Sequence, residues 1–361
     1  MCRTDPLILG AGPAGSAAAI MLARGGAQPL ILERDAHTGD AICGGFISWR
    51  TLATLERLGL AIDKLGGHRV THLVLFTSKS SARARLPRPA IGISRQRLDT
   101  LLLEQAIMQG AAIERGVNIR SIEPSGEIRA ADGSVFDAES LFIATGKHDV
   151  RGVSRDRDGE TTVGIRVLAP AHRAMRAMIG DTIELHLFPG GYCGVMINER
   201  GEGNICMAVR KSLLTRAGGV AALLAWLGTD NPALGERLAF ADARTFEAIS
   251  AVPYGWIAPQ TLTGQFRLGD QAAVIPSLAG EGNGIALASG IMAASAWLDG
   301  GAQAAPLFQQ EFAAAARRPV GTAMRLWHFG ETRIGGQIAT QIITLAPSLA
   351  GYFAGLTRID A

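Results

Sequence analysis

The chain begins with a pattern of apolar and small residues that predicts a strand, a tight turn and a helix. Residues 6–9 read PLIL, which predicts a short buried strand, and the turn GAGPAG follows directly. The next stretch, SAAAIMLARGG, predicts a helix of small side chains, and a second PLIL at 29–32 predicts another buried strand. This strand-turn-helix-strand order is typical of the start of a parallel α/β sheet.

Further along the chain, the apolar pattern alternates between strand-like and helical segments. It predicts helices over 48–59 and 97–110, antiparallel strands within 71–94, and short strands after the second helix, through 141–146. Four strand-like runs with little charge lie between 165 and 210, and a helix is expected over 211–228. A strand starting at Phe266 and a long helix after a glycine-rich loop complete this part.

Composition excludes several classes of protein. The 361 residues are 48% apolar and 19% charged, which is too apolar for a disordered chain, and a net charge of +3 is too small to favour binding of nucleic acid. The four cysteines, Cys2, Cys43, Cys193 and Cys206, have no zinc-site spacing, so no metal is expected. The glycine-rich turn at Gly10 leaves no room for a signal peptide, which predicts a cytoplasmic protein with reduced thiols.

One segment bears on membrane contact. No run of about 18 uninterrupted apolar residues appears, so no transmembrane helix is expected. Residues 335–356 carry no charge, but Pro347 interrupts them and Gln337 and Gln341 make one side polar. We expect helices packed on the body of the protein, with a membrane-contacting tail as the alternative.

The first turn carries candidate chemistry. Gly10, Gly12 and Gly15 have the GxGxxG spacing, in which the glycines permit a sharp turn, close approach of a pyrophosphate, and close packing of helix on strand. Glu33 ends the second strand 18 residues after Gly15, where an acid can bind a ribose hydroxyl. The strand, the helix and the acid together predict a dinucleotide site, and Glu33-Arg34 is more like FAD-binding folds than like NAD dehydrogenases.

A second, remote motif supports a flavin. The stretch from Phe266 predicts a strand ending at Gly269-Asp270, a loop with Pro276, and a helix that begins in the glycine-rich sequence 280–284. The Asp270 carboxylate can bind ribityl hydroxyls, and the free N–H groups of the helix N-terminus can stabilise an anionic reduced flavin.

These motifs resemble the flavoprotein group that contains para-hydroxybenzoate hydroxylase and the geranylgeranyl reductases, over about residues 6–300. In ISRQRLDTLLLEQA, Arg95 with Leu98-Asp99 looks like the flavin-contacting arginine of the group. The stretch Cys43-Gly44-Gly45 is closest to the geranylgeranyl reductase branch. The resemblance and the motifs together imply these cofactor-binding residues: Gly10, Gly12, Pro13, Ala14, Gly15, Glu33, Arg34, Cys43, Gly44, Arg95, Ala144, Thr145, Gly146, Gly269, Asp270, Pro276, Gly280, Gly282, Asn283 and Gly284.

The sequence also departs from this group. Thr145-Gly146 replaces the Asp-Gly motif that hydroxylases use for flavin and nicotinamide handling, although the backbone of 144–146 can still contact flavin. Phe188-Pro189 is retained, but Glu184 and His186 stand where the reductase branch has aromatic residues, which puts a long isoprenoid substrate in doubt. The WxWxIP signature and the active-site lysine of flavin-dependent halogenases have no match.

The expected fold is α/β: a Rossmann-type FAD-binding domain with a three-layer parallel sheet, interleaved with a mixed or antiparallel β-sheet substrate domain and followed by C-terminal helices. The predicted ranges are 1–70, 95–165 and 260–300 for the FAD-binding domain, 71–94 and 166–259 for the substrate domain, and 301–361 for the C-terminal helices.

The predicted activity is that of an FAD-dependent oxidoreductase acting on a hydrophobic small molecule, with NADH or NADPH as electron donor. Reduction of a carbon-carbon double bond is favoured. The alternative is a monooxygenase that hydroxylates an aromatic or polyketide-like ring through a flavin C4a-hydroperoxide, and a non-catalytic flavin protein is a third class. The predicted catalytic residues are His186, Cys43 and Tyr192; Glu184 has the parity to orient His186 from the same strand face.

Overall fold

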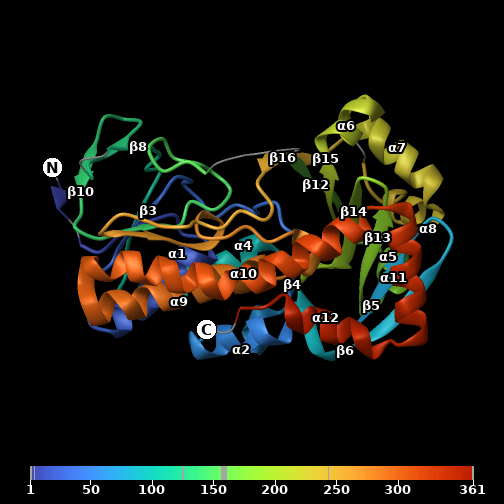
Figure 1. Cartoon of the computed structure of the whole chain (residues 1–361), viewed down its shortest axis with the longest axis horizontal. Coiled ribbons are helices and arrows are strands. Elements are labelled where there is room, and N and C mark those ends of the chain that lie inside the picture. Colours follow the sequence, from blue (N-terminus) through green and yellow to red (C-terminus); the bar gives the residue numbers. More distant parts are fainter. Residues whose placement is uncertain (1, 4, 124–125, 156–160, 243, 360–361) are drawn as a thin grey trace.

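The computed structural model describes residues 2–3, 5–123, 126–155, 161–242 and 244–359, and Figure 1 shows the whole chain. Three sheets and a layer of long helices make up these residues. This arrangement confirms the expected fold class, in which a Rossmann-type sheet is combined with a mixed sheet and C-terminal helices.

A five-stranded parallel sheet, in the order β17-β11-β2-β3-β7, forms the first layer. Its strands are β2 (Leu7–Leu9), β3 (Leu30–Glu33), β7 (Ala112–Arg115), β11 (Leu141–Ile143) and β17 (Gln265–Arg267). Side chains alternate between its faces. Ile8 and Phe142 join the core beneath the helices, whereas Leu7 and Leu9 pack toward a second sheet.

Helices cover one face of this sheet and a small sheet covers the other. The helices are α1 (Pro13–Arg24), α4 (Arg95–Met108) and α9 (Gly282–Gly300), and α9 lies on α1. Their contact is close because Gly290 of α9 leaves space for the backbone of Ala14, which a Cβ would approach to 2.4 Å. The four-stranded sheet, in the order β1-β10-β9-β8, was not predicted; its strands are β1 (Cys2–Arg3), β8 (Ile119–Ile122), β9 (Ile128–Ala130) and β10 (Val135–Asp137).

An eight-stranded mixed sheet, in the order β16-β12-β15-β14-β13-β5-β6-β4, forms the other half of the molecule. All its neighbouring strands are antiparallel except β13 and β5. The strands are β4 (Phe46–Ile47), β5 (His68–Phe76), β6 (Ser81–Gly92), β12 (Thr162–Ala169), β13 (Thr182–Phe188), β14 (Gly191–Ile197), β15 (Gly203–Arg210) and β16 (Glu247–Val252). The four strands expected between 165 and 210 are confirmed as β12 to β15.

The prediction of a single helix over 211–228 is wrong. The chain forms α6 (Lys211–Ala217) and α7 (Val220–Asp230), which meet at an angle of 91°. Gly218 and Gly219 separate them with φ of +83° and +120°, values that a helix cannot contain. The remaining short helices are α2 (Trp49–Arg57), α3 (Ile62–Leu65), α5 (Arg173–Ile179) and α8 (Pro232–Leu238).

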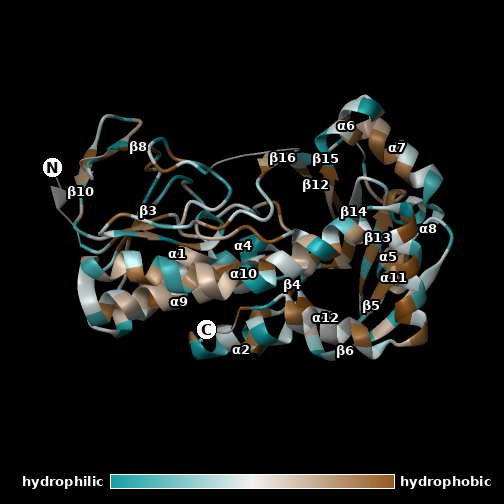
Figure 2. Ribbon diagram, viewed as in Figure 1, coloured by the Kyte–Doolittle hydropathy of each residue, from teal (hydrophilic) through white to brown (hydrophobic). Residues whose placement is uncertain are grey.

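The C-terminal part consists of α10 (Ala305–Gly330), α11 (Arg333–Leu345) and α12 (Ser348–Leu356), after the 3-10 turn η3 (Gly301–Ala304). By length and composition alone, the helical stretch 282–330 is apolar enough to cross a membrane, although α9 within it packs on α1. Helix α11 packs on β6 and β13, and Ile334, Ile338 and Leu345 are exposed on its outer side. In Figure 2, the visible parts of α11 and α12 are largely brown or pale.

Candidate active site

A cavity of about 1150 Å³ lies between the two large sheets, and most of the predicted cofactor residues line it. One half is formed by the turn after β2, the loop 37–45, the turn after β11 and the start of α9. The other half is apolar and is formed by strands of the mixed sheet and by α10 and α11. The main apolar lining residues are Leu73, Leu75, Ile183, Leu185, Leu187, Leu326, Phe329, Ala339, Ile342 and Ile343.

The glycine-rich turn is shaped by close backbone approaches. Gly10 has φ of +102°, and a Cβ there would lie 2.5 Å from the carbonyl oxygen of Ala144. A Cβ at Gly15 would lie 2.0 Å from the carbonyl oxygen of Gly10. Gly15 therefore serves helix packing and does not line the cavity, whereas Gly12, Pro13 and Ala14 do.

Glu33 holds this turn in place. Its Oε2 accepts a hydrogen bond of 2.7 Å from the backbone N–H of Ala11, and Oε1 accepts one of 3.0 Å from Asp35. Glu33 and Arg34 both line the cavity. The acid thus lies where the sequence predicts a ribose-binding group.

Arg95 is fixed beside the same turn. It forms two hydrogen bonds with Asp99, of 2.8 and 2.7 Å, and its Nη2 lies 3.4 Å from the position of a Cβ on Gly12. Burial opposes the charge, but Asp99 outweighs it and raises the pKa of Arg95, so the guanidinium stays positive. A cation beside the start of α1 suits a bound pyrophosphate.

The second motif forms the far side of the cradle. Gly269 and Asp270 lie in the 3-10 turn η1 (Gly269–Gln271) and line the cavity, as do Ala144, Thr145 and Gly146 after β11. Gly280, Gly282 and Asn283 line it at the start of α9. Pro276 and Gly284 do not. A Cβ on Gly284 would lie 2.7 Å from Oε2 of Glu281, which gives this glycine a packing role.

The N-terminal ends of α1 and α9 both border the cavity, at Gly12–Ala14 and at Gly282–Asn283. Ser48 caps α2 and Ser94 caps α4 through their side chains, but neither α1 nor α9 has a side-chain cap. The backbone N–H groups in the first turns of α1 and α9 therefore have no capping side-chain oxygen, and Pro13 at the start of α1 carries no N–H. Two such helix starts in one cavity fit the diphosphate and the flavin ring of FAD.

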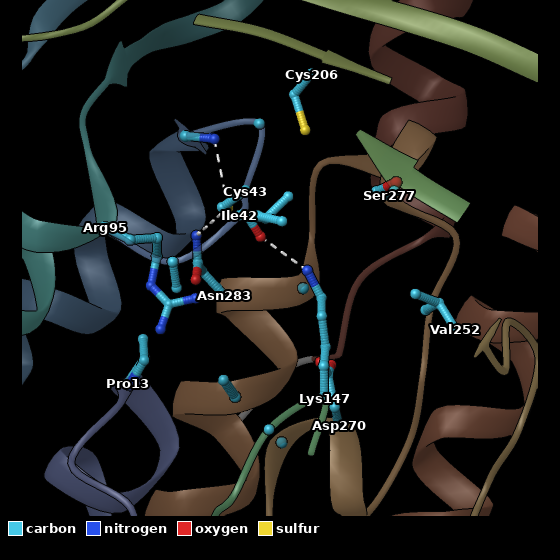
Figure 3. A pocket seen from close by; sticks show the side chains of 18 of the residues that line it. Pro13, Ile42, Cys43, Arg95, Lys147, Cys206, Val252, Asp270, Ser277 and Asn283 are labelled. Carbon is cyan, nitrogen blue, oxygen red and sulfur yellow. Dashed lines mark hydrogen bonds between the residues drawn. The ribbon is translucent and has the colours of Figure 1, made fainter. Parts of the chain in front are cut away.

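The Cys43-Gly44-Gly45 stretch is held against the start of α9 (Figure 3). Asn283 donates to the Cys43 Sγ atom at 3.8 Å, and Asn204 donates to the Cys43 carbonyl oxygen at 2.9 Å. Lys147 reaches across the cavity to the carbonyl oxygen of Ile42, at 2.8 Å. Cys43 and Gly44 line the cavity, so the predicted position of this thiol beside the cofactor cradle agrees with the geometry.

The placement of His186 corrects its predicted catalytic role. Along β13, Ile183, Leu185 and Leu187 point into the cavity, so Glu184 and His186 point away from it. His186 is fully buried, stacks on Phe76 with ring centroids 4.6 Å apart, and lies 3.2 Å from Glu184. Burial lowers the pKa of His186. The pair therefore packs the far face of the sheet, out of reach of a substrate in the cavity.

Glu184 is paired with Arg237 of α8 on that far face, through hydrogen bonds of 2.9 and 2.8 Å. Although burial opposes it, His186 and Arg237 hold the pKa of the Glu184 carboxyl below its usual value. Positions 184 and 186 do not line the cavity, so the lack of aromatic residues there does not alter the cavity wall.

Tyr192, the third predicted catalytic residue, lines the cavity and donates a hydrogen bond of 2.6 Å to Ser277. Sequence reasoning missed Ser277, Tyr254, Lys147 and Arg155. Lys147 is one of four lysines and directly follows Thr145-Gly146, so its position in the sequence could have indicated that it lies at the cofactor cradle. Arg155 is buried, pairs with Asp149 at 2.7 Å and donates to the carbonyl oxygen of Asp270 at 3.1 Å; nothing in its local sequence indicates this.

Comparisons with known proteins agree with this cradle. The family model of the FAD binding domain matches residues 3–135. A menaquinone reductase of Mycolicibacterium smegmatis is 29% identical in an alignment of 333 positions that covers 83% of this chain and 77% of that protein. FixC of Escherichia coli is 27% identical in an alignment of 208 positions that covers 52% of this chain and 48% of that protein.

Solved structures of low identity share the fold. A geranylgeranyl bacteriochlorophyll reductase-like protein of Thermoplasma acidophilum is 17% identical with a TM-score of 0.69, over 98% of this chain and 99% of that chain. PqsL of Pseudomonas aeruginosa, named as a probable FAD-dependent monooxygenase, is 17% identical with a TM-score of 0.71, over 94% and 100%. The flavin-dependent brominase Bmp2 is 16% identical with a TM-score of 0.76, over 99% and 95%.

The two uncapped helix starts, the fixed Glu33 and Arg95, and the match to the FAD-binding family lead to one assignment. This chain is an FAD-dependent oxidoreductase with an FAD-binding domain, and it resembles the group that contains para-hydroxybenzoate hydroxylase and the geranylgeranyl reductases.

Proposed function

We propose that the protein reduces a carbon-carbon double bond of an apolar small molecule, with NADH or NADPH as the source of electrons. The observation that carries this proposal is the apolar half of the cavity, which continues directly from the cofactor cradle. Bound FAD supplies two-electron chemistry, either as hydride to a substrate or in the activation of oxygen.

The residues of the chain bind and orient the substrate, and they exclude water from it. Leu75, Leu185 and Leu187 of β5 and β13 form an apolar wall, with Phe329 and Ile343 from the C-terminal helices. This wall favours a substrate without charge, because burying an unpaired charge in it would cost several kcal/mol. Saturation of the double bond places a hydride on one carbon and a proton on the other.

Cys43 is the group proposed to manage that proton. Its thiol lies on the cradle side of the cavity, 3.8 Å from the Asn283 amide that donates to it. Cys193 and Cys206 have pKa values raised by burial, which keeps both as neutral thiols. Cys193 does not line the cavity, so Cys43 and Cys206 are the two thiols that face it among the described residues.

Monooxygenation of an aromatic ring is the second candidate, since the same cradle supports it and PqsL shares the fold. Anaerobic reduction of the FAD-loaded protein by NADH and by NADPH, followed by mixing with oxygenated buffer, separates the two. Direct reoxidation without a long-lived absorbing species is the result expected for a reductase. A long-lived species would overturn that assignment in favour of a monooxygenase, and protein that takes up no FAD would overturn both.

The predicted partners are limited to the apolar substrate and the electron donor. Nucleic acid is not among them, because the net charge is only +3. The cytoplasmic location and the alternative of membrane contact through the C-terminal helices stay predictions from the sequence.

A further inference from the structure

Three hydroxyl groups from separate parts of the chain meet in the wall of the cavity. They belong to Tyr192 of β14, to Tyr254 after β16, and to Ser277 of the 3-10 turn η2 (Ser277–Ala279). Tyr192 donates to the Ser277 Oγ atom at 2.6 Å, and the Tyr254 hydroxyl lies 2.5 Å from the same atom. We call these three groups the hydroxyl cluster.

The hydroxyl cluster is uncharged. Burial raises the pKa values of both Tyr192 and Tyr254, so both phenols keep their protons at any ordinary pH. Trp327 packs edge-on against both rings, with centroids 5.6 and 5.7 Å away, and fixes their orientation. The neighbouring lining residues are apolar, including Val252, Val274 and Leu278.

A count of protons shows what the cluster offers to a ligand. Three hydroxyls carry three protons, and the two bonds to Ser277 use two of them. Because Tyr192 donates to Ser277, the remaining proton belongs to Ser277 or to Tyr254. The cluster therefore presents a single neutral donor in an otherwise apolar part of the wall.

The cluster also lies at the border between the two halves of the cavity. Ser277 is three residues before Gly280, whose neighbours Gly282 and Asn283 line the cofactor cradle. Figure 3 shows Ser277 on the side of the cavity opposite Arg95 and Cys43. A ligand bound by the cluster can thus extend into the apolar half while one end stays next to the cradle.

We propose that the hydroxyl cluster binds a carbonyl oxygen of the substrate, which makes the substrate an uncharged conjugated carbonyl compound, such as an enone or a quinone. This inference rests on the proposed reductase function. A carbonyl oxygen accepts the single donor, and conjugation makes the distal carbon of the double bond electrophilic. When that carbon accepts a hydride, the electron pair of the double bond shifts and negative charge develops on the carbonyl oxygen, where the donor stabilises it. The carbon next to the carbonyl then takes a proton and the product is saturated.

Binding of two matched probes to the oxidised, FAD-loaded protein tests the proposal. Menadione carries carbonyl groups, and methylnaphthalene has the same ring shape without them. In the triple variant Tyr192→Phe/Tyr254→Phe/Ser277→Ala all three hydroxyls of the cluster are lost, so we expect menadione affinity to fall by about 3-fold to 10-fold, the worth of one hydrogen bond. Affinity for methylnaphthalene should not change.

Ser80→Ala is the control, since it removes the hydroxyl of an exposed serine that does not line the cavity. Its menadione affinity should stay at the parent value. Equal menadione affinity in the parent and the triple variant would overturn the proposal. So would an equal loss of methylnaphthalene affinity, which would indicate a change of cavity shape. FAD content and the oxygen reaction report on the proposed function separately, because neither requires the carbonyl.

Discussion

Single residues in the cofactor cradle act through fixed positions. Both carboxylate oxygens of Glu33 accept hydrogen bonds from backbone N–H groups, one from Ala11 and one from Asp35. Arg95 keeps its charge because Asp99 is bound to it by two hydrogen bonds. Such residues are organised before the ligand arrives, which lowers the cost of binding.

Asp270 is the carboxylate expected to bind the ribityl hydroxyls of FAD. We expect Asp270→Ala to weaken FAD binding, because a charge-assisted hydrogen bond of about 1.5–3 kcal/mol is lost. Titration of the apoprotein with FAD, followed by quenching of flavin fluorescence, measures the change. Asp299→Ala is the control, since Asp299 is an exposed carboxylate near the end of α9 and does not line the cavity. Equal FAD affinity in both variants would remove Asp270 from the site.

At the scale of elements, β13 separates two functions on its two faces. Leu185 and Leu187 face the cavity, and Glu184 and His186 face a buried cluster with Arg237 and Phe76. The strand thus links the wall of the cavity to the core behind it.

His186→Ala tests this separation. We expect it to lower the free energy of unfolding by about 2–4 kcal/mol, because a buried ring and its hydrogen bond are lost. FAD affinity and the rate of flavin reduction should stay at the parent values. Thermal unfolding and stopped-flow reduction measure the two effects. A slowed reduction in a variant with the parent stability would restore the catalytic role that the sequence suggested.

The start of α9 carries another buried ion pair, Glu281–Arg358, which gives a pH dependence. Burial raises the pKa of Glu281 to about 7, although Arg358, 2.7 Å away, opposes the shift. An unfolded glutamate titrates near its ordinary value, so the folded chain binds the extra proton between the two pKa values. The contribution of Glu281 to the free energy of unfolding therefore falls as pH rises from about 4.5 to about 7, by an amount on the order of 1–3 kcal/mol.

Glu281→Gln removes this titration. We expect the difference in unfolding free energy, parent minus variant, to decrease as pH rises from about 5 to about 7.5. Urea unfolding at a series of pH values measures it. A difference that stays constant over this interval would mean that Arg358 offsets burial and that the pKa of Glu281 is not raised.

Sequence patterns predicted elements better than they predicted which side of an element faces the site. The parity of Glu184 and His186 placed both on one face of a strand, but both faces of β13 are largely buried, so no polar side marks the exterior. The motif residues Gly12, Glu33, Arg95 and Asp270 were found because each acts next to its own turn. The hydroxyl cluster was not, since residues 192, 254 and 277 meet only through the packing of distant segments.

At the scale of the whole molecule, the cofactor cradle joins segments that are remote in sequence. Gly12 lies in the first turn, Arg95 at the start of α4, Ala144 after β11, and Asp270 shortly before α9. A ligand that contacts all four opposes separation of any one of them from the others. The folded chain binds FAD and the unfolded chain, with these segments dispersed, does not.

FAD should therefore stabilise the entire fold. At a free FAD concentration about 100 times its dissociation constant, the free energy of unfolding should rise by about 2.7 kcal/mol. Thermal unfolding with and without FAD measures this, followed both by tryptophan fluorescence and by circular dichroism. The four joined segments come from both halves of the sequence. The unfolding temperatures reported by the two signals should therefore rise together. A shift confined to one signal would mean that the mixed sheet and the C-terminal helices unfold independently of the cradle, and that the cavity between them is not a single rigid site.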